Sequence, residues 1–217
     1  AIEVMPMNID LELLKRFEDG LDPEHPERSA IPAKILGYGE ISTIFEIDAE
    51  STKEIACKRM AIFRTDQEVS EYENIYNGYN TLLEKEIRIG VPDYGFAWFF
   101  SAKGNIVAFD IQAKLAPESI ANRALHLMNT ETVRALFLLI IRELAKVWEF
   151  NRLHPDRAIG IDGQISNWSL AGFNPSNPQI SPDSRLLYFD TSTPLMKSGG
   201  VEQLDPELFL RSAPSFL

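Results

Sequence analysis

Residues 160–170 read Gly-Ile-Asp-Gly-Gln-Ile-Ser-Asn-Trp-Ser-Leu, and residues 186–191 read Leu-Leu-Tyr-Phe-Asp-Thr. Asp162 lies five residues before Asn167, and the apolar run of the second stretch ends at Asp190. Phosphoryl transfer uses such groups: one carboxylate orients or deprotonates the attacking hydroxyl, while an amide and a second carboxylate hold the metal ions that bridge the nucleotide phosphates. Asp and Asn are also common turn residues, so this interpretation depends on what lies upstream.

The composition sets broad limits on the class of protein. A chain of 217 residues with 45% hydrophobic content fits one large domain or two lobes. Its single cysteine, Cys57, excludes an internal disulfide framework and a cysteine zinc cluster, and we expect it to be a small buried residue. The sequence has no apolar run of membrane-helix length and no secretory signal pattern, so we expect a cytoplasmic protein without a membrane partner.

The net charge of −11 argues against nucleic acid as a partner. The chain has 21 basic and 32 acidic residues, and no basic stripe with interleaved aromatic residues. Such a surface repels nucleic acid and anionic lipid. It suits a cationic substrate, or it serves solubility alone.

The first half of the chain has the pattern of a small antiparallel sheet with helices. Periodicity predicts a short helix from Asn8 to Leu21, and a proline-bearing connector follows it. Strands are expected over residues 34–47 (with a glycine turn inside), 54–63, 94–102 and 106–115. Thr65 or Asp66 caps a helix that runs to about Glu86. One face of this helix carries Val69, Tyr72, Tyr76, Tyr79 and Leu83.

The second half is more helical. Residues 117–128 predict a short helix and residues 130–153 a long one. After the long helix comes the loop that carries Asp162 and Asn167, here called the acidic loop, and then a strand. An Asn/Pro/Ser-rich segment over residues 171–185 leads to a second strand, which ends at Asp190. The apolar face of the long helix is expected to carry Val133, Phe137, Ile140, Ile141, Leu144, Val147 and Trp148.

This order predicts an α+β protein with two lobes and a cleft between them, where ligands commonly bind. We place an N-terminal helix and connector in residues 1–32, a β-rich lobe in residues 33–115, and a helical lobe with the loops that carry Asp162, Asn167 and Asp190 in residues 116–217. The resemblance described next makes the first lobe nucleotide-binding and these loops catalytic and metal-binding.

The whole course of the chain resembles the protein-kinase-like fold of aminoglycoside, choline and other small-molecule phosphotransferases. Residues 36–42 (Leu-Gly-Tyr-Gly-Glu-Ile-Ser) resemble its glycine-rich loop, with Ser42 in place of the third glycine. Gly37 and Gly39 would let the backbone approach the phosphates of ATP. Lys58, in the middle of the third strand, resembles the lysine that holds the α- and β-phosphates.

The resemblance assigns the remaining roles. It expects a glutamate on the following helix to pair with Lys58; Glu73, 15 residues further on, is the first choice, with Glu68 and Glu71 as alternatives. Asp162 resembles the catalytic-loop aspartate, and Asn167 and Asp190 resemble the ligands of Mg²⁺. The implied architecture has an antiparallel N-terminal lobe with one main helix and a truncated, mostly helical C-terminal lobe.

The sequence departs from the family pattern in the acidic loop. Gly160 stands two residues before Asp162, where these families usually have His, and Asp190 is followed by Thr191 and Ser192. The chain also lacks an activation segment ending in Ala-Pro-Glu, unlike a conventional protein kinase.

Three functions stay open on this basis. The first is ATP- and Mg²⁺-dependent phosphoryl transfer to a hydroxyl of a small-molecule acceptor. The second is a catalytically silent nucleotide-binding or scaffold protein on the same fold. The third is transfer of a nucleotidyl group.

Overall fold

The computed structural model describes residue 7, residues 10–39 and residues 41–211, with the exception of the Phe209 side chain. The structure is α+β with antiparallel sheets, as the sequence predicts. The chain forms two compact units. Residues 1–73, 93–114 and 205–217 make the first, here called the sheet unit, and residues 74–92 and 115–204 make the second, the loop unit.

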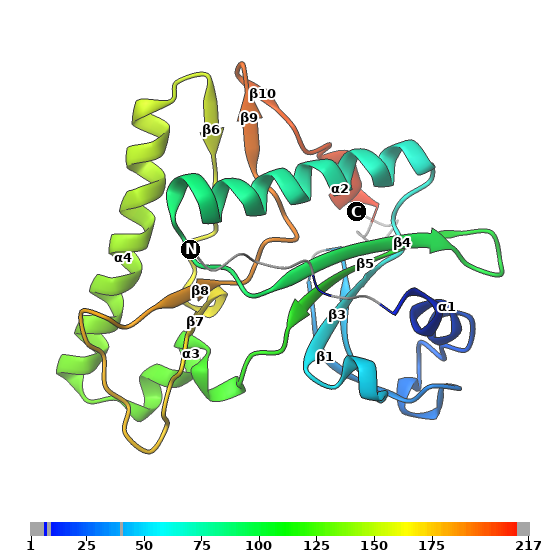
Figure 1. Cartoon of the computed structure of the whole chain (residues 1–217), viewed down its shortest axis with the longest axis horizontal. Coiled ribbons are helices and arrows are strands. Elements are labelled where there is room, and N and C mark those ends of the chain that lie inside the picture. Colours follow the sequence, from blue (N-terminus) through cyan, green and yellow to red (C-terminus); the bar gives the residue numbers. More distant parts are fainter. Residues whose placement is uncertain (1–6, 8–9, 40, 212–217) are drawn as a thin grey trace. The chain divides into compact units, whose positions relative to one another are not determined.

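A five-stranded antiparallel sheet in the order β1-β2-β3-β5-β4 is the centre of the sheet unit (Figure 1). The expected hairpins are present, because the glycine turn and residues 101–105 reverse the chain between adjacent strands. The unit also contains α1 (Leu11–Asp19), part of α2 (Asp66–Thr81) and α5 (Glu207–Leu210). The strands are β1 (Ala33–Tyr38), β2 (Thr43–Ile47), β3 (Ile55–Met60), β4 (Tyr94–Phe100) and β5 (Ile106–Ala113).

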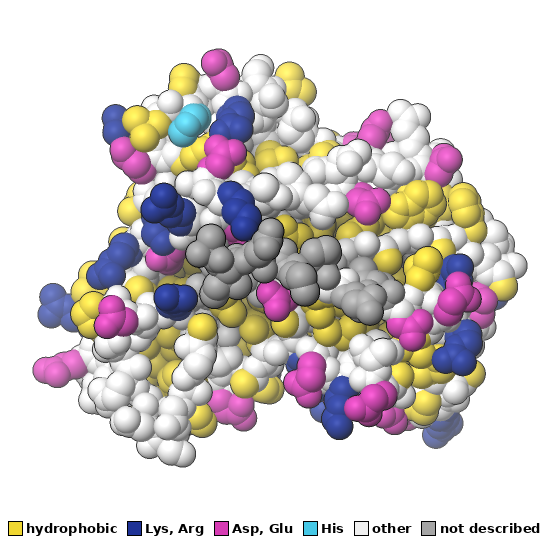
Figure 2. All heavy atoms as spheres, viewed as in Figure 1, with side chains coloured by type: hydrophobic (Ala, Val, Ile, Leu, Met, Phe, Trp, Pro, Cys, Tyr) yellow, Lys and Arg dark blue, Asp and Glu magenta, His cyan; other side chains and the backbone are white. Residues whose placement is uncertain are grey.

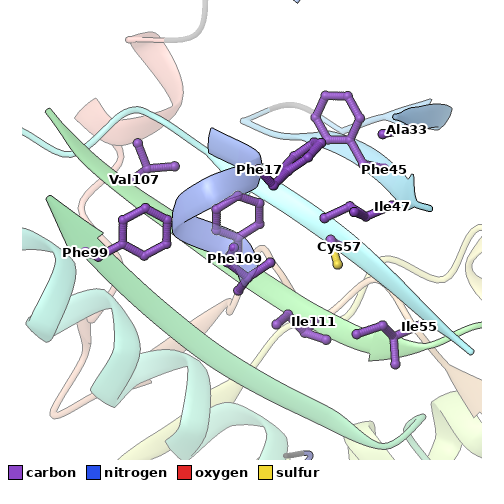
Figure 3. Packing of buried hydrophobic residues seen from close by; sticks show 11 residues of the cluster. Phe17, Ala33, Phe45, Ile47, Ile55, Cys57, Phe99, Val107, Phe109 and Ile111 are labelled. Carbon is purple, nitrogen blue, oxygen red and sulfur yellow. The ribbon is translucent and has the colours of Figure 1, made fainter. Parts of the chain in front are cut away.

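Side chains alternate between the two faces of this sheet. One face packs on α1, which Asp10 caps by accepting a hydrogen bond from Leu13 N at 3.0 Å. Phe17 of α1 is fully buried against Phe45 and Phe109, with ring centroids 5.5 and 6.4 Å apart (Figure 3). Burial of one such side chain contributes about 1.5–3 kcal/mol. The predicted start of the first helix, Asn8, lies outside the described residues.

Cys57 belongs to this same apolar cluster and is fully buried (Figure 3). Burial, with a smaller contribution from the Asp110 carboxylate, raises the pKa of its thiol to about 12. The thiol therefore stays protonated, and the expected role of a small buried residue is confirmed.

Helix α2 begins as predicted, with the Thr65 hydroxyl accepting from Glu68 N at 3.1 Å. All five residues of its predicted apolar face are buried. The helix does not continue as an α-helix to Glu86, because the last turns widen to a π-helix at Leu82–Ile87. Arg88 then ends it in the left-handed conformation, with φ of 64°.

The loop unit is built around α4 (Thr130–Leu153), which has the predicted bounds and is capped by Asn129. Asn151 joins α4 to β6 through two hydrogen bonds with the backbone of Ile159. Figure 1 shows β6 following α4 in the chain and lying beside it. The predicted helix over residues 117–128 is broken into short pieces, with α3 covering only Ala121–Ala124. The remaining strands are β6 (Arg157–Ile159), β7 (Trp168–Leu170), β8 (Leu186–Tyr188), β9 (Met196–Ser198) and β10 (Val201–Glu202).

The predicted apolar face of α4 is partly wrong. Phe137, Ile141 and Trp148 are exposed, and Trp148 retains 63% of its surface. The buried positions are Thr132, Leu136, Leu139, Ile140, Glu143, Val147 and Phe150. The helix is apolar around much of its circumference, so periodicity alone did not select the packed face.

Basic and acidic side chains lie next to one another at several places on the face shown in Figure 2. Among the described residues, no helix has both the length and the apolar character to cross a membrane.

Candidate functional site

The predicted glycine loop forms the turn between β1 and β2. Gly39 N donates to the Ser42 carbonyl oxygen at 2.9 Å, and the strand register shifts between Ile35 and Gly37. A Cβ atom on Gly39 would lie 2.8 Å from Ser42 Oγ, so a side chain at this position would force the Ser42 hydroxyl to move. Residue 40 lies outside the described part of the chain. Phosphate binding by this turn stays a prediction.

Lys58 lies on the face of the sheet opposite the Phe17 cluster, since Cys57 points into that cluster and side chains alternate. Its Nζ is 3.5 Å from the Asp110 carboxylate, which belongs to the adjacent strand in direct register. Both side chains are buried, with 7% and 0% of their surfaces exposed. Asp110 is therefore the counter-ion that the structure places beside this lysine.

The three glutamates considered as the partner of Lys58 have other partners. Glu73 accepts a hydrogen bond from Trp98 Nε1 at 3.2 Å. Glu68 makes a bidentate pair with Arg211, at 2.8 and 3.0 Å, and Glu71 accepts from Gln67 Nε2. The predicted Lys58–Glu73 pair is thus corrected to Lys58–Asp110. Spacing along the chain did not reveal Asp110, because the pairing of β3 with β5 brings it there.

The three residues predicted in the second half lie close together in the loop unit. Asn167 ends a 3₁₀ turn, and its Nδ2 lies 3.3 Å from Asp190 Oδ2 and 3.4 Å from the Asp162 carbonyl oxygen. Pairing of β7 with β8 fixes this arrangement, since Phe189 N also donates to the Asn167 carbonyl at 3.1 Å. The Asn167 amide and the Asp190 carboxylate, which lie 23 residues apart in the sequence, are therefore in contact in the structure.

The Asp162 carboxylate is held by its own loop. Oδ1 accepts from Gln164 N at 3.1 Å, and Oδ2 accepts from Gln164 Nε2 at 3.0 Å. The first contact is the Asx-turn that an aspartate in a loop commonly makes. Gln164 is exposed, so a solvent-borne molecule can reach this pair.

Two buried tyrosines contact the backbone of this loop, and the sequence predicted only the burial of one of them. Tyr79 of α2 donates its hydroxyl proton to the Gly160 carbonyl at 2.9 Å. The Tyr188 hydroxyl of β8 accepts from Asp162 N at 3.2 Å. Burial, and then the nearby Asp190 and Asp162 carboxylates, raise the pKa of Tyr188; burial is also the main cause of the raised pKa of Tyr79. Both phenols therefore remain protonated at neutral pH.

Gly160 stands where the resembled families usually have His. A Cβ atom here would lie 3.0 Å from Leu195 Cβ and 3.3 Å from its Cδ1, so the packing of Leu195 leaves no ordinary room for a side chain. Gly160 N donates to the Leu195 carbonyl at 2.8 Å. The loop is consequently anchored through backbone groups at this position.

The chemistry of Asn167 and Asp190 suits Mg²⁺, which takes hard oxygen ligands and obtains few of them from protein. A half-turn of the Asn167 amide would exchange Nδ2 for Oδ1 beside the Asp190 carboxylate. Within the described ranges, no group of three or more His, Cys, Asp and Glu side chains is placed to hold a metal. A Mg²⁺ ion here would complete its coordination with phosphate and water oxygens.

Two cavities are lined by residues other than these. One of about 410 Å³ in the loop unit includes Asn77, Thr81, Glu86, Arg157 and Met196 in its lining. One of about 430 Å³ in the sheet unit includes Glu27, Lys34, Glu46 and Lys53. The candidate site is therefore defined by its side chains and their contacts, and not by these cavities.

The chain belongs to a family of unknown function, DUF6206, whose model matches residues 24–216. No curated protein matches the sequence.

Proposed function

We propose that this member of the DUF6206 family is an ATP- and Mg²⁺-dependent phosphotransferase that acts on a hydroxyl of a small molecule, on a two-lobed protein-kinase-like fold. The contact between the Asn167 amide and the Asp190 carboxylate, beside the loop that carries Asp162, is the observation on which the proposal rests. The resemblance to kinase-like enzymes predicted that these three residues act together, and their proximity is what a metal–nucleotide site needs.

In this proposal Asp162 orients the acceptor hydroxyl and receives its proton. The acceptor oxygen forms a bond to the γ-phosphorus of ATP, while the bond from that phosphorus to the β–γ bridging oxygen breaks and ADP leaves. Asn167 and Asp190 would hold the ion. Bound Mg²⁺ supplies charge neutralisation of the phosphates. Lys58 and the turn containing Gly37, Gly39 and Ser42 would position the nucleotide. Glu73 contacts Trp98 in the structure and is not given a role in binding.

The electrostatics of the loop support a bound cation. The Asp162 and Asp190 carboxylates both contribute to raising the pKa of Tyr188 and Tyr79, after the larger effect of burial. Negative charge at this position favours a divalent ion and disfavours free ATP without one.

A catalytically silent nucleotide-binding protein is the second candidate, and a specific contact favours it. Gln164 occupies both oxygens of the Asp162 carboxylate, which an acceptor hydroxyl would have to reach. The absence of a side chain at Gly160 agrees with the same interpretation.

Nucleotide binding is tested by thermal-shift titration with ATP, with and without Mg²⁺, on the wild type and on Asp190→Ala. At 100 times the dissociation constant, a ligand stabilises the folded state by about 2.7 kcal/mol. We expect Mg²⁺ to increase the shift in the wild type but not in Asp190→Ala. Asp183→Asn, which removes an exposed charge from another part of the loop unit, should behave like the wild type. A wild type that ATP does not stabilise would refute both candidates.

Turnover distinguishes the candidates from one another. Wild-type protein with Mg·ATP and a panel of amino alcohols, sugars and amines should release ADP, and Asp162→Asn should not. Binding without release of ADP would favour the silent protein. Release of pyrophosphate would indicate nucleotidyl transfer.

A further inference from the structure

Tyr79 and Tyr188 each hold one end of the tripeptide Gly160–Asp162. Tyr79 donates to the Gly160 carbonyl at 2.9 Å, and the Asp162 amide donates to the Tyr188 oxygen at 3.2 Å. The tyrosines come from α2 and β8 and are fully buried, with at most 1% of their surfaces exposed. Two separate elements therefore fix adjacent backbone groups of the loop that carries Asp162.

The two contacts use opposite properties of the hydroxyl group. Tyr79 donates its proton to a carbonyl, and Tyr188 offers an oxygen lone pair to an amide. Together they fix a carbonyl at one end of the tripeptide and an amide at the other.

The Tyr79 contact accounts for a feature of the loop that spacing left unexplained. Gly160 has no side chain with which to anchor the loop, and a Cβ atom there would crowd Leu195. The hydroxyl of Tyr79 supplies an anchor at that position from a different element. Because only Ile161 separates the two anchored groups, backbone freedom gained at the Gly160 carbonyl extends to the Asp162 amide.

We propose that Tyr79 and Tyr188 are positioning residues, whose two hydrogen bonds hold the backbone of Gly160–Asp162 and thereby direct the Asp162 carboxylate. The catalytic consequence rests on the proposed function, while the two backbone contacts do not. Tyr188 also lies two residues before Asp190, so β8 carries both a loop anchor and a proposed ligand of Mg²⁺. A fixed loop backbone keeps Asp162, Asn167 and Asp190 in a constant arrangement.

Hydrogen exchange of the Asp162 amide tests the two contacts independently of any activity. Tyr188→Phe removes the acceptor of this amide, and Tyr79→Phe removes the anchor at the other end of the tripeptide; both variants keep the aromatic side chain. We expect exchange of the Asp162 amide to become about tenfold faster or more in each variant. Val147→Ala, a truncation of a buried residue of α4, is the control for lost stability and should leave this amide protected. Unchanged exchange in Tyr79→Phe, or equal acceleration in Val147→Ala, would overturn the proposal.

Kinetics tests the consequence for Asp162. In a wild type that transfers phosphoryl groups, Tyr79→Phe and Tyr188→Phe should lower kcat about tenfold or more and leave the KM for ATP within about twofold. A parallel loss in Val147→Ala would indicate a merely structural effect and overturn the positioning role. A wild type without turnover would refute the proposed phosphotransferase, and hydrogen exchange would then decide the inference on its own.

Discussion

The ion pair of Lys58 with Asp110 provides the sharpest test of what the lysine does. Asp110→Asn removes the negative charge and leaves an ammonium group whose side chain is only 7% exposed. At the observed 3.5 Å, the attraction of two unit charges is about 5 kcal/mol at an effective dielectric constant of about 20. Removal of one partner from a buried pair costs about 3–5 kcal/mol, and the length of this contact favours the lower end.

Replacement of both partners should behave differently. Lys58→Met with Asp110→Leu removes the two charges together and avoids their desolvation, so we expect stability within about 2 kcal/mol of the wild type. The same double variant should lose the stabilisation by Mg·ATP if Lys58 binds phosphate. If Lys58 only neutralises the charge of Asp110, Mg·ATP should stabilise the double variant as much as it stabilises the wild type.

Urea unfolding followed by circular dichroism measures the free energies. The matched control is Lys114→Met, which breaks the pair with Glu46 on the same sheet, where about a third of each side chain is exposed. We expect a loss of about 1 kcal/mol or less there. A loss below about 1 kcal/mol in Asp110→Asn would refute the electrostatic account of the buried pair. A full nucleotide shift in the double variant would refute the role of Lys58 in binding phosphate.

Two further outcomes follow from the structure. The Arg211 guanidinium lowers the pKa of Glu68 from 4.5 to about 2, so the pair stabilises the fold above about pH 4.5 and loses this effect as the pH falls toward 2. Because both groups are partly exposed, Glu68→Gln should lower the free energy of unfolding by about 1 kcal/mol at pH 7. The difference in melting temperature between this variant and the wild type should shrink near pH 2.5. A difference that stays constant with pH would contradict this. Gly160→Ala should lose about 1–3 kcal/mol by contact with Leu195, and Leu195→Ala in the same chain should restore part of it; no rescue would place the clash elsewhere.

Periodicity and capping in the sequence predicted the helices whose start and end depend on neighbouring residues. Helix α4 begins beside Asn129 and ends at Leu153 as periodicity and capping require, and Thr65 caps α2. The short strands β6, β9 and β10 were missed, because two or three residues are too few to show alternation. Trp148 was assigned to the core wrongly, since α4 has apolar residues on its exposed side as well.

Some residues of the candidate site could be predicted from the sequence and others could not. Asp162, Asn167 and Asp190 were chosen from their spacing and from the resemblance to kinase-like enzymes, and the pairing of β7 with β8 brings Asn167 to Asp190. Asp110 could not be predicted, because its position beside Lys58 depends on β5 lying next to β3 in the sheet. The seven-residue spacing from Tyr72 to Tyr79 predicts burial on one helix face, but periodicity does not indicate which backbone group a buried hydroxyl meets.

The contact of Gln164 with Asp162 separates the active and silent interpretations only weakly on energetic grounds. Gln164 is exposed, and its two hydrogen bonds to Asp162 compete with water, so each contributes about 0.5–1.5 kcal/mol. An acceptor hydroxyl that replaces the Nε2 contact makes a bond of the same kind, and the Asx-turn from Gln164 N can remain. The displacement is therefore nearly balanced. What activity requires is that the Asp162 backbone stays in place while its carboxylate changes partner, and this is the part of the loop that Tyr79 and Tyr188 hold.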